Sequence, residues 1–294
     1  MSNQVKLVQV DEQTVAFQGN TYPVKDRIKV VGGAKWNPKQ KHWEAPMESL
    51  SEIVRLFPNI QMDEQIKAGF QELQKRVKLV KEIKQKENAE VKIKGLKAKL
   101  YPYQAVGVEF LDTLKQGEGA ILAYEMGLGK SLTSLAMVQK WINEGVIDYC
   151  LVVCPSPLKY ATWKKEVEKW TDLSYIVVDG SKPVKVMWDD GTTEKLKGQR
   201  LREVQYQQWM PEVADTKITI VNYELFRIDY DLIVENMPVN HRWCVILDEC
   251  HRIKNPKAKT TKNLRKALKG AGRKILATGT PLENNLEELW ASVD

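Results

Sequence analysis

The sequence predicts an α/β protein in which a small α+β domain and a linker helix precede a parallel sheet with helices on both faces. Near-continuous apolar strands alternate with helix-length segments from residue 100 onward, which is typical of a parallel sheet covered on both sides. Short strands and turn residues fill residues 1–60, which indicates a separate small unit. The length of 294 residues fits about two domains.

The composition excludes several classes of protein. With 43% hydrophobic and 28% charged residues, the chain resembles globular proteins. No apolar run approaches the roughly 20 residues of a transmembrane helix, and the N-terminus lacks the apolar region of a signal peptide. The four cysteines have neither the number of a disulfide framework nor the spacing of a zinc site. We expect an intracellular monomer with core thiols and no membrane contact, in the cytoplasm or nucleoid of a bacterium or virus or in a eukaryotic nucleus.

Residues 1–60 form the first predicted domain. Its candidate strands are Val5–Val10, Thr14–Gln18, Ile28–Val31 and His42–Ala45. A glycine pair and an Asn-Pro step provide the turn signals between the last two strands. Ser49 is a candidate N-cap for a short helix that ends at Phe57, before a proline.

Residues 61–99 form the predicted basic linker helix. Between Asp63 and Ala89, apolar residues recur at three and four positions and form one helix stripe. The stripe consists of Ile66, Phe70, Leu73, Val77, Val80 and Ile83. We favour a helix packed on its neighbours over a coiled coil, because barely three heptads are present.

Residues 100–294 carry the predicted parallel sheet. Its candidate strands are Ala120–Tyr124, Tyr149–Cys154, Tyr175–Val178, Lys217–Val221, Trp243–Asp248 and Lys274–Thr278. Helix candidates between them include Leu132–Asn143, Leu158–Trp170 and Lys257–Leu268. Val184–Trp188 and Thr193–Leu196 flank an Asp-Gly step, which predicts an inserted surface hairpin.

A glycine-containing loop follows the first strand of this sheet. It runs from Glu125 to Gly129, and Lys130 and Ser131 open the next helix. Such a loop aims backbone N–H groups and the positive end of a helix at one point. The glycines let the backbone approach a phosphate, the lysine supplies a positive charge, and the serine hydroxyl suits Mg²⁺. Tyr124 stands where the strict P-loop pattern has glycine, so the loop alone is a weak signal.

Two adjacent carboxylates, Asp248 and Glu249, end the apolar strand Trp243–Asp248. Carboxylates in such a place are costly unless a cation or water uses them. Phosphoryl transfer needs one carboxylate for Mg²⁺ and one group to orient or deprotonate the attacking water. Asp248 fits the first role and Glu249 the second. The alternative, a pair that merely caps a helix, is disfavoured by the phosphate loop upstream.

Six segments of residues 100–294 resemble, in the same order, the motifs of a known family. They are LYPYQAVGVEFL, AYEMGLGKSLTSLA, LVVCPSPLKYATWKKEVEKW, ITIVNYELF, VILDECHRIKN and ILATGTPLENNLEELW. These resemble the Q motif and motifs I, Ia, Ib, II and III of superfamily-two ATPases of the SWI/SNF-type DNA translocase group. The resemblance implies the first RecA-like lobe of a P-loop NTPase, with ATP and Mg²⁺ as cofactors and DNA as partner.

The resemblance also implies roles for single residues. Gln104 would read the adenine edge, and the loop that contains Met126, Gly127, Leu128 and Gly129 would hold the phosphates together with Lys130. Ser131 and Asp248 would bind Mg²⁺, and Glu249 would act on the attacking water. Residues His251, Thr278 and Thr280 would couple the ATP site to the nucleic-acid side. The group usually has an acidic residue in place of Tyr124, a basic one in place of Tyr101 and often alanine in place of Cys250.

A basic run follows the acidic motif, with ten Lys or Arg and no acidic residue between His251 and Lys274. A solvated helix face is the default interpretation, yet ten like charges repel one another unless a polyanion is near. In the resembling group, the predicted phosphate contacts would be Lys159, Asn222, Tyr223, Lys254, Asn255, Lys257 and Lys259. We expect salt-sensitive, sequence-tolerant binding to duplex or forked DNA.

The formal net charge of +7 comes from the N-terminal third. Residues 1–60 hold 8 basic and 6 acidic side chains, residues 61–99 hold 11 and 6, and residues 100–294 hold 26 of each.

The segments from Asp26 to Pro38 and from Lys41 to Pro46 resemble the small HARP-type DNA-binding domain that precedes the motor of annealing helicases. Alternatively, Trp36 and Trp43 face each other as a cross-strand core pair in an ordinary hairpin.

We therefore expect the ATP-binding half of a DNA-dependent ATPase that translocates on, remodels or anneals DNA, with a role in DNA repair or replication. The chain stops within a helix signal, so we expect an excised half or a truncated product. Hydrolysis would need the second RecA-like lobe of the full-length protein, since a missing arginine finger costs about 10³–10⁵ in rate. The alternatives are a nucleotide- and DNA-binding module without catalysis of its own, or an RNA helicase.

Overall fold

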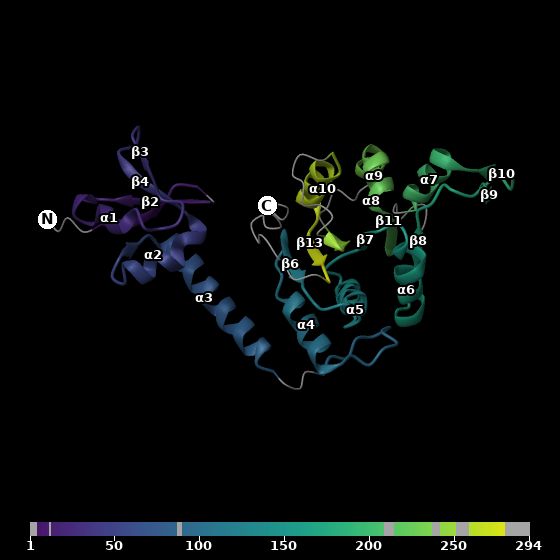
Figure 1. The fold of residues 1–294 in the computed structure, drawn as a ribbon, viewed down its shortest axis with the longest axis horizontal. Coiled ribbons are helices and arrows are strands. Elements are labelled where there is room, and N and C mark those ends of the chain that lie inside the picture. Colours follow the sequence, from purple (N-terminus) through teal and green to yellow (C-terminus); the bar gives the residue numbers. More distant parts are fainter. Residues whose placement is uncertain are drawn as a thin grey trace. The chain divides into compact units, whose positions relative to one another are not determined.

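The computed structural model describes residues 5–11, 13–86, 90–208, 215–236, 242–250 and 259–279. The chain divides into two compact units, Met1–Gln85 and Lys86–Asp294 (Figure 1). The first unit is a small mixed sheet with helices, and the second is an α/β lobe. Among the described residues, no helix is both long enough and apolar enough to cross a membrane.

The first unit is built on a five-stranded sheet in the order β3-β4-β2-β1-β5. Its strands are β1 (Lys6–Gln9), β2 (Thr14–Gln18), β3 (Lys35–Asn37), β4 (His42–Pro46) and β5 (Gln61–Met62). The pairing is antiparallel except between β1 and β5. Leu7, Val15 and Phe17 contribute to the buried apolar core of this unit.

The predicted strand Ile28–Val31 is wrong. A short 3-10 helix, Tyr22–Val24, leads instead into α1 (Lys25–Ile28), and the chain turns before β3. Ile28 and Val31 are both buried. Their spacing of three residues places both on the same side of a helical turn, so the apolar pair indicated helix rather than strand.

Two further helices complete the first unit. These are α2 (Leu50–Leu56), preceded by a 3-10 turn at Met47–Ser49, and α3 (Glu64–Lys84). Ser49 occupies the cap position of α2, but its hydroxyl donates to the carbonyl of Gly32. Asp63 caps α3 through a hydrogen bond from the Ile66 N–H, 2.8 Å long. Ile66 is buried in the core of the first unit, so this unit extends through the helix to Gln85 and not only to residue 60.

The second unit contains a six-stranded parallel sheet in the order β6-β13-β12-β7-β11-β8. The strands are β6 (Glu118–Leu122), β7 (Tyr149–Cys154), β8 (Tyr175–Val177), β11 (Ile218–Asn222), β12 (Trp243–Asp248) and β13 (Arg273–Ala277). Every residue of β7, β11 and β12 is buried. The predicted covered parallel sheet is confirmed.

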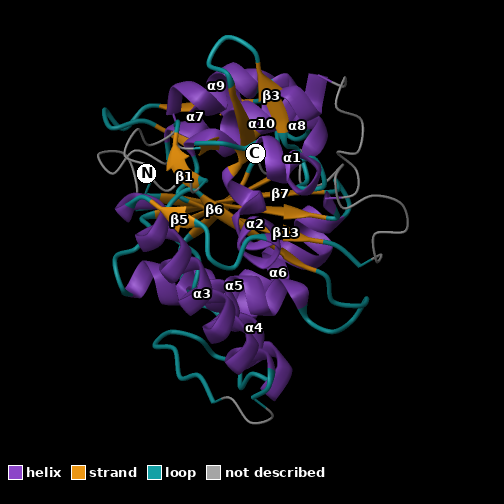
Figure 2. Cartoon of the chain, turned by 90° about the vertical axis from the view of Figure 1, so that its left-hand side faces the viewer, coloured by secondary structure: helices purple, strands orange, loops and turns teal. Residues whose placement is uncertain are grey.

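Helices cover both faces of this sheet (Figure 2). One face carries α4 (Pro102–Asp112), α5 (Lys130–Asn143), the π-helical segment η3 (Lys159–Lys164) and α6 (Lys165–Trp170). The other carries α7 (Gly198–Gln207), α8 (Tyr223–Ile228), α9 (Tyr230–Asn236) and α10 (Lys259–Gly270). The predicted hairpin is present as β9 (Val184–Met187) paired with β10 (Thr193–Leu196).

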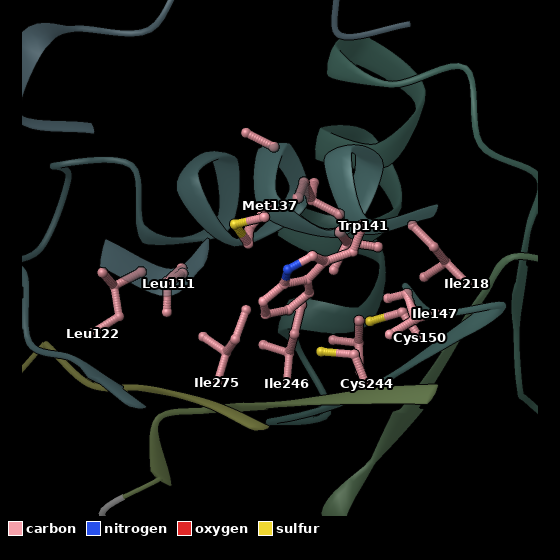
Figure 3. Close-up of a cluster of buried hydrophobic side chains, with 14 of the residues drawn as sticks. Leu111, Leu122, Met137, Trp141, Ile147, Cys150, Ile218, Cys244, Ile246 and Ile275 are labelled. Atoms are coloured by element: carbon pink, nitrogen blue, oxygen red, sulfur yellow. The ribbon is translucent and has the colours of Figure 1, made fainter. Parts of the chain in front are cut away.

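Alternate strand residues supply the two cores. Cys244 and Ile246 of β12 face α5, where Trp141 lies over them (Figure 3), while Val245 and Leu247 belong to the opposite core. The four cysteines are buried and free, as the sequence predicted. The segment before α4 also belongs to this unit, because Val91, Ile93 and Leu96 pack against its core.

Candidate nucleotide site

The carboxyl ends of three neighbouring strands define the site. Asp248 at the end of β12 pairs with Ala277 of β13, and Ala277 pairs with Leu122 of β6. The loops that follow these three strands therefore start side by side. Ligands of open α/β sheets bind at this edge, beyond the carboxyl ends of the strands.

The phosphate loop joins β6 to α5 and depends on two glycines. Gly127 and Gly129 have φ values of +83° and +77°, which other residues rarely adopt. Gly129 is the residue before α5, and a Cβ there would overlap the side-chain amide of Gln104. Met126 is 79% exposed at the tip of the loop, and Leu128 is also exposed. The loop thus presents backbone N–H groups at the N-terminus of a 14-residue helix, the usual setting for a bound phosphate.

Lys130 folds back over the loop. Its ammonium donates to the carbonyls of Tyr124, at 3.0 Å, and Glu125, at 3.3 Å. Ser131 is the second residue of α5. Both residues therefore lie in the first turn of the helix, where the predicted contacts to phosphate and Mg²⁺ require them.

Asp248 is a buried carboxylate that is held by neutral donors. Its Oδ2 accepts the indole N–H of Trp163 at 2.8 Å, and its Oδ1 accepts the N–H of Glu249 at 3.1 Å. Burial raises the pKa of Asp248, although the Trp163 hydrogen bond opposes this shift. A cation would restore the charged form, and the oxygen donors of Asp248 and Ser131 are the hard ligands that Mg²⁺ prefers. These residues fit a magnesium ion.

Glu249 reaches across to the end of β13. Its backbone has φ +50°, and its Oε2 accepts the N–H of Gly279 at 3.3 Å. A Cβ on Gly279 would lie 3.2 Å from the Lys130 Nζ and 3.5 Å from the Glu249 Oε1. Gly279 therefore lies between the predicted phosphate-binding lysine and the predicted water-activating glutamate.

Gln104 connects α4 to the phosphate loop. Its Oε1 accepts the N–H of Tyr101 at 3.0 Å, and its Nε2 donates to the carbonyl of Leu128 at 3.2 Å. The hydroxyl of Tyr103 donates to the same carbonyl at 3.1 Å. Both polar atoms of Gln104 are thus engaged inside the lobe and its side chain is buried, so its contact with an adenine edge stays a prediction.

Tyr124, the departure from the group's pattern, fills the space between α4 and α5. Its hydroxyl donates to the carbonyl of Tyr103 at 3.2 Å, and burial raises its pKa. A Cβ on Gly107 of α4 would overlap this hydroxyl and lie 3.1 Å from Thr133 of α5. Gly107 therefore permits the close packing that the tyrosine needs.

The coupling residues are described only in part. Thr278 is buried after β13, and its N–H donates to the carbonyl of Leu122 at 3.3 Å, so it lies at the same sheet edge. His251 and Thr280 lie outside the described residues, as do the predicted DNA contacts Lys254, Asn255 and Lys257. Lys259 is the first residue of α10.

Three predicted DNA contacts are buried. Lys159 donates to the carbonyl of Val178 at 3.0 Å and lies 3.5 Å from an Asp179 oxygen. Asn222 caps α8, and the hydroxyl of Tyr223 donates to the carbonyl of Asp248 at 2.8 Å. Because these polar groups are engaged inside the lobe, their placement argues against direct contact with a phosphate.

The basic run separates into two groups. Lys262, Lys266 and Lys269 are exposed on α10. Lys274 is instead buried in β13, where its ammonium donates to the carbonyl of Gly117 at 2.9 Å. The run is thus not a single surface, and its described exposed part is the outer face of α10.

Sequence reasoning missed Trp163, Gly107 and Gly279. Glycine inside a helix costs about 1 kcal/mol of stability relative to alanine. Its presence at position 107 therefore indicated a place where a neighbouring side chain packs closely against the helix. Gly279 lies between two predicted coupling threonines, which pointed to the same site. The contact of Trp163 with Asp248 spans 85 residues, and no local pattern reveals it.

The sequence is similar to a known protein family and to several curated proteins. Residues 103–294 match the model of the SNF2-related domain. Protein CHROMATIN REMODELING 19 of Arabidopsis thaliana is 33% identical over 203 residues, which cover 66% of this chain and 24% of that protein. DNA excision repair protein ERCC-6-like of Danio rerio is 28% identical over 275 residues, which cover 87% of this chain and 17% of that protein.

Among solved structures, the Sulfolobus solfataricus SWI2/SNF2 ATPase core in complex with dsDNA is similar to this chain. It is 24% identical with a TM-score of 0.48, and the match covers 69% of this chain and 36% of that one. The chain spans less than a quarter of the length of these two curated relatives. The family match covers most of the chain and includes the phosphate loop and both acidic residues, so this protein belongs to the SNF2-related domain family.

Proposed function

We propose that this chain is the ATP-binding half of a DNA-dependent ATPase that translocates on, remodels or anneals duplex or forked DNA. The observation that supports it best is the convergence of Lys130, Asp248 and Glu249 at one sheet edge, with Gly279 between the lysine and the glutamate. A capping pair would not need this arrangement, because it would have no reason to face a phosphate loop.

Each residue then has a physical task. The loop N–H groups and Lys130 bind the β and γ phosphates, and Gln104 reads the adenine edge. Ser131 and Asp248 hold Mg²⁺, which when bound neutralises charge on the phosphates. Glu249 orients the attacking water, and its hydrogen bond from the Gly279 N–H keeps its carboxylate directed toward the phosphate loop. Thr278 and Gly279, which belong to motif III, link that carboxylate to the end of β13.

Hydrolysis is proposed to need a second lobe, as in the motors that the motifs resemble. The test is the ATPase rate of a protein that joins this chain to its second lobe, with duplex, forked and single-stranded DNA and with RNA. We expect DNA to stimulate the rate, and we expect Lys130→Ala and Glu249→Gln to abolish the stimulation. Stimulation by RNA alone would favour an RNA helicase. Nucleotide and DNA binding without turnover would leave a binding module.

We further propose that the first unit binds DNA, as the HARP-like resemblance implies. Trp36 and Trp43 are opposite one another on β3 and β4, with ring centroids 5.7 Å apart in an edge-to-face pair. Trp36 is nevertheless 46% exposed, so the pair is not a closed core. Exposed lysines at positions 35, 39 and 41 lie on the same hairpin, which suits contact with phosphates and stacking on unpaired bases.

This second proposal has its own test. The triple substitution of Lys35, Lys39 and Lys41 by alanine should weaken binding to forked or single-stranded DNA. The matched control is the same substitution at Lys75, Lys78 and Lys81 of α3, which removes equal charge from the same unit. Equal losses in both variants would mean that only net charge matters and that the hairpin is not the binding surface.

A further inference from the structure

Asp248 is held by two segments that follow the neighbouring strands β7 and β11. Trp163 lies in η3, which follows β7, and its indole N–H donates to the Asp248 Oδ2 at 2.8 Å. Tyr223 begins α8, which follows β11, and its hydroxyl donates to the main-chain oxygen of Asp248 at 2.8 Å. Strands β12, β7 and β11 are consecutive in the sheet. One segment therefore holds the side chain of Asp248, and the other holds its main chain.

The local helix geometry is unusual at the point where Trp163 makes this contact. Residues Lys159–Lys164 form a π-helix, and α6 continues from Lys165. π-helical turns are rare and frequently occur at functional sites. Lys159 ties the start of the segment to Val178 and Asp179, and Trp163 ties its end to Asp248. The side chain of Trp163 is completely buried, so this donor does not serve solvent or a surface ligand.

The two hydrogen bonds to the Asp248 carboxylate leave it able to bind a metal. Trp163 occupies one lone pair of Oδ2, and the Glu249 N–H occupies one of Oδ1. Each oxygen retains a second lone pair, while the plane of the carboxylate is fixed. A partner that orients a metal ligand typically changes metal affinity by about 10- to 100-fold when it is removed.

We propose that Trp163 is a positioning residue for the magnesium site, and that η3 and α8 together fix the orientation and the position of Asp248. The proposal rests on the proposed function, because it assumes that Asp248 is the Mg²⁺ ligand. Each segment contacts Asp248 directly, so loss of the Trp163 hydrogen bond frees the orientation of that ligand, and loss of the Tyr223 hydrogen bond frees its main chain.

The test compares Trp163→Phe with Trp141→Phe. Both remove an indole from the same buried core, but Trp141 lies in the last part of α5, away from the phosphate loop. For each variant, ATP affinity is measured by isothermal titration calorimetry with excess Mg²⁺ and again with EDTA. Trp163→Phe should weaken the Mg²⁺-dependent affinity by roughly 10-fold or more and leave the EDTA value within about twofold. Trp141→Phe should leave the ratio of the two affinities unchanged.

Tyr223→Phe provides a milder second variant, since it removes one hydroxyl. It should lower the same ratio by a smaller factor, and thermal unfolding identifies any variant that does not fold. If Trp163→Phe does not fold, the Tyr223→Phe ratio decides alone. An unchanged ratio, or an equal loss in the Trp141→Phe control, overturns the inference while the proposed function stands. Failure of the unsubstituted chain to bind Mg²⁺ and ATP overturns the proposed function and this inference with it.

Discussion

The phosphate loop and the segments after β7 and β11 lie along the same edge of one sheet, yet they differ in how far their side chains are exposed. The loop exposes Met126 and Leu128 and leaves Lys130 half-buried. The segments after β7 and β11 bury Lys159 and Tyr223 and direct them into the lobe. The first region is built to receive a ligand, and the second is built to hold the residues of the site.

This difference shows what a motif specifies. Its position after a parallel strand places it at the ligand-binding edge of the sheet. Whether a given side chain then faces solvent depends on contacts with distant residues. We therefore expect no phosphate contact from a motif lysine that is buried inside the lobe, such as Lys159.

The largest expected effect is at Gly129. Gly129→Ala places a side chain at φ +77° and against the Gln104 amide. The left-handed backbone costs about 1–2 kcal/mol, and displacement of Gln104 disturbs the adenine side of the site as well. We expect the affinity for ATP to fall by about tenfold or more, since tenfold corresponds to about 1.4 kcal/mol. Calorimetric titration of ATP measures it.

Gly117→Ala is the matched control for this substitution. Gly117 has φ +84° but has no atom within 4 Å of an added Cβ. It lies before β6, at the opposite end of that strand from the loop. The free energy of unfolding in urea should fall by a similar amount in the Gly117→Ala variant, while its affinity for ATP should stay unchanged. If both variants lose affinity equally, the effect is general destabilisation and not the geometry of the loop.

The next effect separates buried from exposed lysines. Lys159→Met should lower the free energy of unfolding by about 1–3 kcal/mol, because it removes the ammonium that donates to the carbonyl of Val178 and the positive charge beside Asp179. The salt dependence of DNA affinity should not change in the Lys159→Met variant.

Replacing Lys262, Lys266 and Lys269 by alanine should instead reduce the slope of log affinity against log salt by about 0.9 for each DNA phosphate that the protein no longer neutralises. A reduced slope in Lys159→Met would make that lysine a DNA contact after all.

A smaller effect concerns Asp179 and pH. Burial alone would raise the pKa of Asp179, but hydrogen bonds from Ser181 and Tyr160 and the charge of Lys159 lower it to about 2. An aspartate with a depressed folded-state pKa stabilises the fold above its unfolded pKa, near 3.9, and loses that contribution as pH falls toward the folded value. Asp179→Asn should therefore be less stable than the unsubstituted chain at neutral pH, and the difference should shrink between about pH 4 and pH 2. Thermal unfolding across this range measures it, and a constant difference would exclude the ionised carboxylate as the cause.

The sequence predicted the elements in which one pattern dominates. Trp243–Asp248 and Tyr149–Cys154 are the strands that their apolar runs indicated, because a central parallel strand is buried on both sides. The strand predicted from the sequence at Ile28–Val31 is wrong, because two apolar residues at this spacing fit a helical turn as well as a strand. The order of Lys130, Asp248 and Glu249 indicated the site, but Trp163, Gly107 and Gly279 act through contacts between segments far apart in the chain. Lys159 and Tyr223 are likewise buried by contacts with segments far apart in the chain, which their local sequence does not reveal.

The affinity of this chain for ATP in the presence of Mg²⁺ tests the central claim most directly. Calorimetric titration should show binding by the unsubstituted chain, a large loss in Lys130→Ala, and in Asp248→Asn a loss that appears with Mg²⁺ and disappears with EDTA. That pattern follows from a lysine that contacts phosphate and an aspartate that acts through the metal. Equal binding by all three proteins, or an Asp248→Asn loss of the same size in EDTA, would contradict the account.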